Sequence, residues 1–195
     1  CQGCVVRCKR VARSDGPWQV DPTYGGPEYE TAAAFGSLCG VSDLEAICKA
    51  HELCNTYTLD TISTGVTIAF AMECFENGLL TDRDTDGLEL RFGNAPAMLA
   101  CVHKIARREG LGDLLAEGST YVAQKIGQGA EAYVINVKGQ PFPMHEGRTR
   151  HGQALGYAVS PTGADHMHNV WDEGFARDPV GEGAYNVGVY EPIPP

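Results

Sequence analysis

Three cysteines stand close together at the start of the sequence, in the stretch CQGCVVRC. Two residues separate Cys1 from Cys4, and three separate Cys4 from Cys8. Thiolates at these spacings converge if the chain wraps around one centre, which is typical of an iron–sulfur cluster or a structural zinc ion. Zinc sites of this kind usually have a second C-x2-C or H-x3-H pair, and none follows. The single group therefore favours a [4Fe-4S] cluster, which usually needs a fourth protein ligand.

Five more cysteines stand singly among apolar residues on segments that we expect to be helical. A free cysteine in such a place is usually a small buried hydrophobe. A chain of 195 residues with 43% hydrophobic residues needs no disulfide framework for its stability. If the fourth cluster ligand lies within this chain, Cys48 and Cys54 are the candidates, although buried single cysteines are weak ones. The full set is Cys39, Cys48, Cys54, Cys74 and Cys101.

Acidic and histidine side chains form the next candidate groups. Glu28 and Glu30 come just before an expected helix, where acidic residues usually complement the helix dipole. Asp60 suits the N-cap of another helix, but a carboxylate also accepts two hydrogen bonds from a ring such as a pterin, whose N–H and NH2 groups lie side by side. His166 and His168 stand in the glycine-rich stretch GADHMHN, and two histidines in a loop raise the expectation of function.

The acidic stretch DRDTDG, residues 82–87, has the opening pattern of a calcium-binding EF-hand loop. Position twelve of such a loop is a bidentate glutamate, and here it is Gly93. We reject the calcium site, because calcium needs this carboxylate to complete its oxygen cage.

Charge and hydropathy exclude other functions. A net charge of -10 disfavours a nucleic-acid surface, because phosphate binding depends on clustered Lys and Arg. No apolar run approaches the roughly 20 residues that span a bilayer, and no segment resembles a signal peptide, so we expect a cytoplasmic protein without membrane contact. A local basic group, Arg7, Lys9 and Arg10, either is a solvated turn or receives an acidic protein near the cysteines.

Helical periodicity along most of the sequence predicts a mainly α fold. The expected helices span residues 31–38, 42–57, 60–78, 94–110, 112–117 and 119–126. Their expected start signals are a Ser42–Glu45 capping box, Asp60 and Asn94, and their stop signals are Gly40, Gly78 and Gly110. Only residues 133–137 alternate like a strand. Little periodicity follows, so we place a boundary near Asn136, between domains 1–136 and 137–195.

The order of these features resembles the tungsten-containing aldehyde ferredoxin oxidoreductase family. The resemblance rests on CQGCVVRC, GPEYETAAAFGSLCG, LDTISTGVTIAFAMECFENG, DTDGLELRFGN and YAVSPTGADH, which occur in the family's order and at about its spacings. It extends to His166, and we cannot align residues 170–195. The chain does not begin with Met, so we expect a segment of a longer protein that holds the first helical domain and the start of the second.

The resemblance implies two cofactors. Family members hold a [4Fe-4S] cluster on a C-x2-C-x3-C group and a fourth cysteine far downstream, so Cys1, Cys4 and Cys8 are the implied ligands here and the fourth is expected beyond residue 195. Members also carry tungsten, occasionally molybdenum, on the dithiolenes of two pyranopterins, with an N-terminal β domain over one face.

The family's first pterin motif, D-x-x-G-L-C/D, appears here as NTYTLD. The implied pterin-binding residues are therefore Asn55, Leu59 and Asp60, although Asn55 replaces the family's aspartate and Thr58 its glycine. His168 stands where a pterin-contacting lysine is expected.

A glutamate and a histidine flank the metal in the family, and by position they resemble Glu30, with Glu28 second, and His166. The resemblance outweighs the helix-dipole explanation of the acidic pair. It implies that Glu30 takes a proton from the water attacking an aldehyde carbonyl while His166 hydrogen-bonds the oxygen. Two electrons then leave singly through the cluster to ferredoxin, which docks near Arg7 and Lys9.

Two alternatives remain open. One is a reductive tungsten enzyme of the benzoyl-CoA reductase type, and the other is a non-catalytic iron–sulfur electron-transfer module without a pterin. The glutamate and histidine that bind an interface iron in some family members are not recognisable, so the sequence gives no support to a metal-bridged dimer and leaves a homodimer open.

Overall fold

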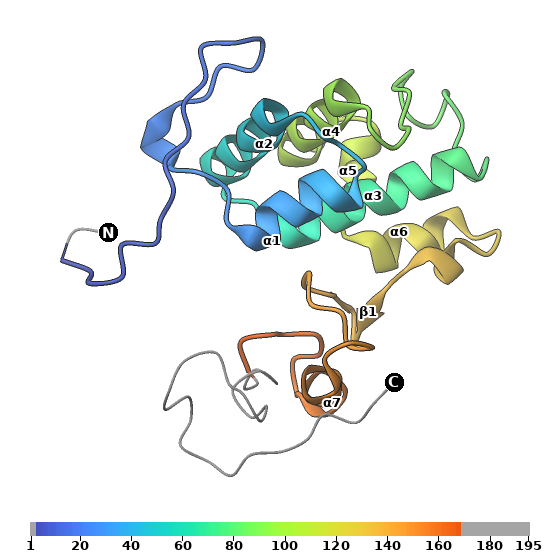
Figure 1. Cartoon of the computed structure of the whole chain (residues 1–195). Helices are drawn as coiled ribbons and strands as arrows, with labels where there is room; N and C mark the ends of the chain where they lie inside the picture. Colours follow the sequence, from blue (N-terminus) through green and yellow to red (C-terminus); the bar gives the residue numbers. More distant parts are fainter. Residues whose placement is uncertain (1–2, 169–195) are drawn as a thin grey trace. The chain divides into compact units, whose positions relative to one another are not determined.

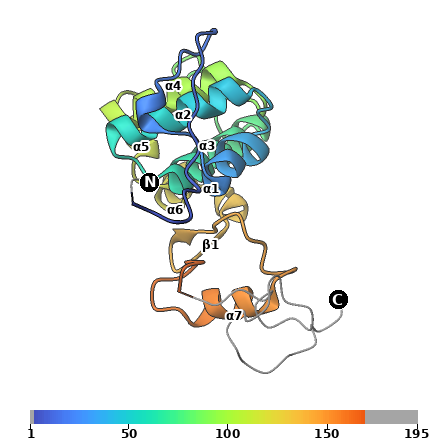
Figure 2. The ribbon, with the colours of Figure 1, turned by 60° about the vertical axis from the view of Figure 1, so that its left-hand side comes forward.

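The structure, a computed structural model, describes residues 3–168. The chain divides into two compact units, Cys1–Val134 and Ile135–Pro195. The predicted mainly α fold is confirmed, because the described residues form helices and one short two-stranded sheet (Figures 1 and 2). The domain limits 1–136 and 137–195 stay a prediction. Among the described residues, no helix is both long and apolar enough to cross a membrane.

The first unit is a helical bundle in which α4 packs against both α2 and α3 (Figure 1). The helix α3 is apolar on nearly all sides, as expected for a helix that is buried in a core. Its Ile68 and Met72 are fully buried with Phe35, Met98 and Val102 from other elements. The elements are η1 (Pro22–Tyr24), α1 (Tyr29–Ala32), η2 (Ala33–Leu38), α2 (Leu44–Tyr57), α3 (Thr61–Glu76), α4 (Ala95–Arg107), α5 (Leu111–Leu115), α6 (Ser119–Ile126) and η3 (Ala130–Tyr133).

Two of the predicted helix starts are confirmed. The Asp60 carboxylate accepts from Ser63 N at 2.6 Å, and the Asn94 side chain accepts from Ala97 N at 3.2 Å. Gly78 follows α3 with a φ of +73°, as a left-handed stop requires.

Other predicted helix limits are wrong. The N-cap of α2 is Asp43, whose Oδ1 accepts from Ala46 N at 3.1 Å, so the Ser42–Glu45 box does not form the cap. The Asp43 carboxylate, one residue nearer the helix than Ser42, supplies the acceptor instead. At the end of α4, Arg108 itself turns left-handed with a φ of +53°, so the helix ends before Gly110.

The segment expected as one helix over residues 31–38 is instead a short α-helical turn, α1, followed by the π-helical segment η2. The fully buried Cys39 ends η2, and its thiol donates to Ala34 O at 3.3 Å and to Gly65 O at 3.6 Å. The thiol therefore links η2 to α3. π-Helical turns of this kind occur frequently at functional sites.

The loop of residues 14–24 lies against α2, through tertiary contacts that no local sequence pattern predicts. Trp18 Nε1 donates to Asp43 Oδ2 at 3.0 Å, and the backbone N–H of Asp21 donates to Glu52 Oε2 at 2.8 Å. His51 Nε2 donates to the carbonyl of Tyr24 at 3.1 Å. These bonds attach residues 14–24, which follow the cysteine stretch, to the helical bundle.

The second unit contains β1 (Asn136–Val137), β2 (Gln140–Pro141) and α7 (His151–Val159). The strands pair antiparallel, with Val137 opposite Gln140, around the turn residues Lys138 and Gly139, whose φ angles are +55° and +82°. Two positive φ angles are the mark of a tight hairpin turn. The strand predicted over residues 133–137 is thus shorter, and Tyr133 ends η3 instead.

Candidate functional site

The cysteine stretch forms an exposed loop at the start of the first unit. Cys4 and Cys8 are both exposed, whereas Cys1 lies outside the described residues. The backbone N–H groups of Arg7 and Val6 donate to the Cys4 sulfur and lower the pKa of its thiol. Gly3 and Arg7 have left-handed φ angles of +75° and +46°, so the backbone turns sharply on both sides of Cys4. A thiolate held by backbone N–H groups suits a cluster ligand.

The five remaining cysteines are buried in the helical bundle, as the sequence predicts. Cys54 exposes no surface, and burial raises the pKa of its thiol to about 12. Burial also raises the pKa of the Cys48 thiol. A cluster ligand has to be a thiolate, so the packing of these two residues disfavours them as the fourth ligand.

The two glutamates before α1 differ in their surroundings. Glu28 is exposed, and its carboxylate pairs with the Arg10 guanidinium. Glu30 lies in the first turn of α1 and is half-buried. The neighbouring Thr31 is buried, and its hydroxyl lies 2.8 Å from the Thr61 hydroxyl at the start of α3. This bond ties the Glu30 turn to the helix that Asp60 caps.

The stretch NTYTLD forms the corner between α2 and α3. Thr58 adopts a left-handed conformation with φ and ψ of 60° and 43°, and Leu59 N donates to Cys54 O at 2.8 Å. A left-handed corner is the conformation that glycine adopts most readily. The side-chain amide of Asn55 donates to the carbonyl of His51 at 2.8 Å. Asp60 is exposed at the corner, where its Oδ1 caps α3.

His166 lies in the second unit, and Glu30 lies in the first. The imidazole of His166 stands beside that of His145, with ring centroids 5.0 Å apart and planes inclined by 36°. His145 is the single histidine of the stretch PFPMHEGR and belongs to no recognisable motif, so the sequence offered no signal for it. His168 instead makes local contacts, with Nδ1 lying 3.0 Å from the Thr162 hydroxyl and 3.2 Å from Asp165 Oδ2.

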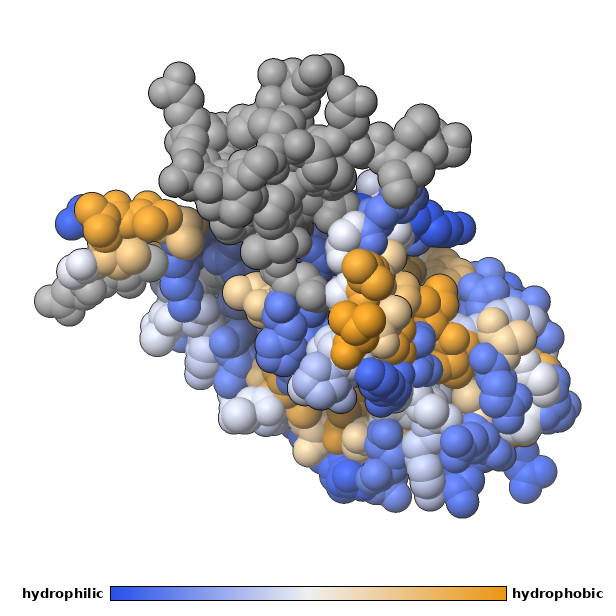
Figure 3. Space-filling model, turned by 90° about the horizontal axis from the view of Figure 1, so that it is seen from below, coloured by the Kyte–Doolittle hydropathy of each residue, from blue (hydrophilic) through white to orange (hydrophobic). Residues whose placement is uncertain are grey.

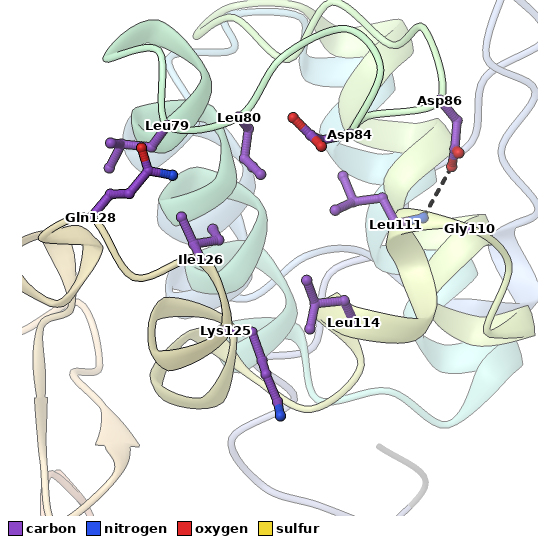
Figure 4. Close-up of a pocket in the computed structure, with 10 residues that line it drawn as sticks. All are labelled: Leu79, Leu80, Asp84, Asp86, Gly110, Leu111, Leu114, Lys125, Ile126 and Gln128. Carbon is purple, nitrogen blue, oxygen red and sulfur yellow. Dashed lines mark hydrogen bonds between the residues drawn. The ribbon is translucent and has the colours of Figure 1, made fainter.

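A cavity of about 490 Å³ opens in the first unit, and none of these candidate residues lines it (Figure 4). Leucine and isoleucine side chains form its walls, and Asp84, Lys125 and Gln128 add polar groups. Asp86 belongs to the rejected calcium loop, and its Oδ2 instead accepts from Leu111 N at 3.0 Å and from Lys104 Nζ at 2.9 Å. The acidic loop therefore anchors α4 and α5.

A family model described as "Aldehyde ferredoxin oxidoreductase, domains 2 & 3" matches residues 1–186. The chain belongs to this family. The tungsten-containing aldehyde ferredoxin oxidoreductase of Pyrococcus horikoshii is 39% identical over 170 residues, which are 86% of this chain and 27% of that protein. The corresponding enzyme of Pyrococcus furiosus is also 39% identical, over 87% of this chain and 27% of that protein.

Two more distant relatives have different activities in their names. The WOR-like subunit of an aliphatic sulfonate oxidoreductase from Pyrococcus furiosus is 34% identical over 84% of this chain and 27% of that protein. The active site complex of benzoyl coenzyme A reductase, solved with 1,5-dienoyl-CoA, has a chain that is 30% identical with a TM-score of 0.60. The match covers 70% of this chain and 21% of that one. The family member described here thus spans about a quarter of the length of its curated relatives.

The residues of this chain suit an iron–sulfur cluster better than they suit a pterin. The exposed Cys4 and Cys8, in a loop that directs N–H groups at sulfur, are the right donors for an iron–sulfur cluster. At the corner of α2 and α3, Asp60 presents a carboxylate with one oxygen on the helix cap. Asn55 adds an amide where the family has a carboxylate, so this corner offers one anionic acceptor to a pterin.

Proposed function

We propose that the parent protein of this chain is a tungsten–pterin oxidoreductase that oxidises aldehydes to carboxylic acids and passes the electrons through a [4Fe-4S] cluster to ferredoxin. The observation that carries the proposal is the 39% identity to tungsten-containing aldehyde ferredoxin oxidoreductases over 86% of the chain. The exposed cysteine loop supports the cluster part of the proposal. A cytoplasmic location and a homodimer remain predictions.

In this proposal Cys1, Cys4 and Cys8 hold the cluster, with a fourth cysteine from elsewhere in the parent protein. Asp60 accepts hydrogen bonds from a pterin ring, and Asn55 and Leu59 line the same corner. When bound, the tungsten–pterin would supply a two-electron acceptor for the oxidation, and the cluster would supply a one-electron path to the ferredoxin. Molybdenum is the alternative metal.

Glu30 and His166 handle the protons. The carboxylate of Glu30 takes a proton from the water that attacks the aldehyde carbon, and the half-buried position of Glu30 limits competing bulk water. The imidazole of His166 donates a hydrogen bond to the carbonyl oxygen as negative charge develops on it. The basic residues Arg7 and Lys9 beside the cysteine loop offer an acidic ferredoxin a place to dock.

The test is elemental analysis of the full-length parent protein, purified without oxygen, followed by assays with aldehydes and a ferredoxin. Tungsten or molybdenum at about one per four irons, as one cofactor and one [4Fe-4S] cluster require, together with aldehyde oxidation, supports the proposal. Iron alone would reduce the protein to an electron-transfer module. Zinc alone would contradict the cluster.

A reductive enzyme of the benzoyl-CoA reductase type is the second candidate. The specific observation in its favour is the structural similarity to the chain of the benzoyl coenzyme A reductase complex, with a TM-score of 0.60 and 30% identity. Both candidates share the metal content, so the substrate separates them. Reoxidation of the reduced protein by benzoyl-CoA, without turnover of any aldehyde, would favour this candidate.

A further inference from the structure

Two imidazole rings lie side by side in the second unit. The rings of His145 and His166 have centroids 5.0 Å apart, and a ring nitrogen of one lies within 4.8 Å of a ring nitrogen of the other. Both side chains are half-buried, so they are accessible to a small molecule. The neutral imidazole carries one N–H donor and one acceptor, so the pair offers two donors within a few ångströms of each other.

Helix α7 holds in place the two loops that carry His145 and His166. The side-chain amide of Gln153 donates to the carbonyl of His166 at 3.3 Å, and the Tyr157 hydroxyl donates to the carbonyl of His145 at 3.2 Å. Both α7 side chains are buried, and the ring of Phe142 packs 5.3 Å from that of Tyr157. Buried supports of this kind fix the geometry of a binding site before the ligand arrives.

Gln153 adds an independent observation. It exposes no surface, and within residues 3–168 its Oε1 accepts no hydrogen bond. Buried polar atoms nearly always have a partner, which can be an ordered water or a bound molecule. The same amide group contacts the His166 backbone through its nitrogen, so this unfilled acceptor lies next to the histidine loop.

We propose that His145 is a second substrate-contacting residue beside His166, and that the two imidazoles together select aldehydes with a hydroxyl or oxo group on the carbon next to the carbonyl. The inference rests on the proposed aldehyde oxidation and adds the substrate class. His166 holds the carbonyl oxygen, and His145 holds the second oxygen. Two donors at most 4.8 Å apart can each reach one of two neighbouring oxygens at the usual hydrogen-bond length of about 2.9 Å.

Glycolaldehyde and propionaldehyde are the best pair of substrates to test recognition of the second oxygen. They have nearly the same size, and a hydroxyl in the first replaces a methyl group in the second. A site built to hydrogen-bond a hydroxyl discriminates strongly against an analogue that lacks it, because its polar groups are then left unpaired. We expect the full-length holoenzyme to prefer glycolaldehyde by a kcat/KM ratio of about tenfold or more. A ratio near one in the unmodified enzyme would overturn the inference.

The variant His145→Phe keeps a ring of similar shape and removes both nitrogens. We expect it to lower the ratio of kcat/KM for glycolaldehyde to kcat/KM for propionaldehyde by about tenfold or more, to near one. His145→Gln keeps an N–H donor and should retain most of the discrimination. His151→Phe, at an exposed position at the start of α7, is the matched control and should leave the ratio unchanged. An unchanged ratio in His145→Phe would overturn the inference.

Binding of the two product acids gives a readout that does not depend on turnover. Calorimetric titration of the full-length protein with glycolate and with propionate should show tighter binding of glycolate, and His145→Phe should remove the difference. Equal binding of both acids to the unmodified protein would contradict the proposed role of His145. If no aldehyde is oxidised at all, the proposed function fails, and the titration still decides whether the histidine pair recognises a second oxygen.

Discussion

Gly65 in α3 lies directly against Ala34 in η2. A Cβ placed on Gly65 would come within 2.7 Å of the Ala34 Cβ and 3.0 Å of the Ala34 carbonyl carbon. The two helical segments therefore cross with their backbones in contact. Glu30 stands four residues before Ala34, and Asp60, the N-cap of α3, stands five residues before Gly65. This crossing thus fixes how the candidate base is placed relative to the candidate pterin-binding corner.

The substitution Gly65→Ala should destabilise the protein by about 1–3 kcal/mol, because the added methyl group meets backbone atoms that cannot move aside. The higher helix propensity of alanine offsets part of this cost, by about 1 kcal/mol. Urea unfolding of the full-length protein measures the change. Ser63→Ala in the same helix removes an oxygen instead of adding a carbon and should change stability by less than about 0.5 kcal/mol. Equal stability of the two variants would contradict the close crossing.

The substitution Thr58→Gly should stabilise the protein by about 1 kcal/mol, because a β-branched residue at a φ of 60° is strained and glycine is not. The comparison is Arg108→Gly, at the left-handed end of α4 with a φ of 53°. Arg108 also pairs with Asp113 and Glu117, so Arg108→Gly should stabilise the protein less than Thr58→Gly does. A loss of stability in Thr58→Gly would show that the threonine side chain has a compensating contact.

Cys54→Ser should leave the iron content of the anaerobically purified protein unchanged, since Cys54 is buried and its thiol has a pKa raised to about 12. Cys8→Ser, in the exposed loop, should lose most of the iron. Iron analysis and the absorbance of the cluster distinguish the two variants. Loss of the cluster in Cys54→Ser, with the fold intact by circular dichroism, would make Cys54 the fourth ligand after all.

The stability of the first unit should fall as the pH drops below 6.5, the ordinary pKa of histidine. Partial burial, with Arg107 and Lys49 nearby, lowers the pKa of His103 in the folded state, and its Nδ1 lies 3.0 Å from the Tyr57 hydroxyl. The unfolded chain then binds more protons in this range, so acid favours unfolding. When thermal melts are compared between about pH 7.5 and pH 5.5, the melting temperature of His103→Gln should fall less across this range than that of the unmodified protein. Parallel pH profiles would contradict the lowered pKa.

The sequence predicted well those features that depend on local chemistry. Asp60 and Asn94 cap their helices because a short acceptor side chain at a helix start needs only its neighbours. The helix α7 was missed, since Gly152 and Gly156 weaken its propensity and the contacts of Gln153 and Tyr157 with distant loops stabilise it instead.

The candidate site was predicted only in part, for the same physical reason. A spacing of cysteines or a cap motif is visible along the chain, but the pairing of His145 with His166 joins residues twenty-one positions apart in irregular loops. The π-helical segment likewise depends on the Gly65 crossing and the Cys39 thiol, which are tertiary contacts. The placement of Glu30, Asp60 and His166 in one reaction site stays a prediction.

Glu30→Gln should lower kcat for aldehyde oxidation by about 10²–10⁴-fold, because the amide cannot take a proton from water while it keeps the shape of the carboxylate. Tungsten and iron contents should be unchanged. Glu28→Gln is the matched control, since the Glu28 carboxylate is exposed and pairs with Arg10. We expect Glu28→Gln to change kcat by less than about threefold, because exposed ion pairs contribute little. If Glu28→Gln abolished turnover and Glu30→Gln did not, the base would be Glu28, and the ion pair with Arg10 would have to open before each reaction.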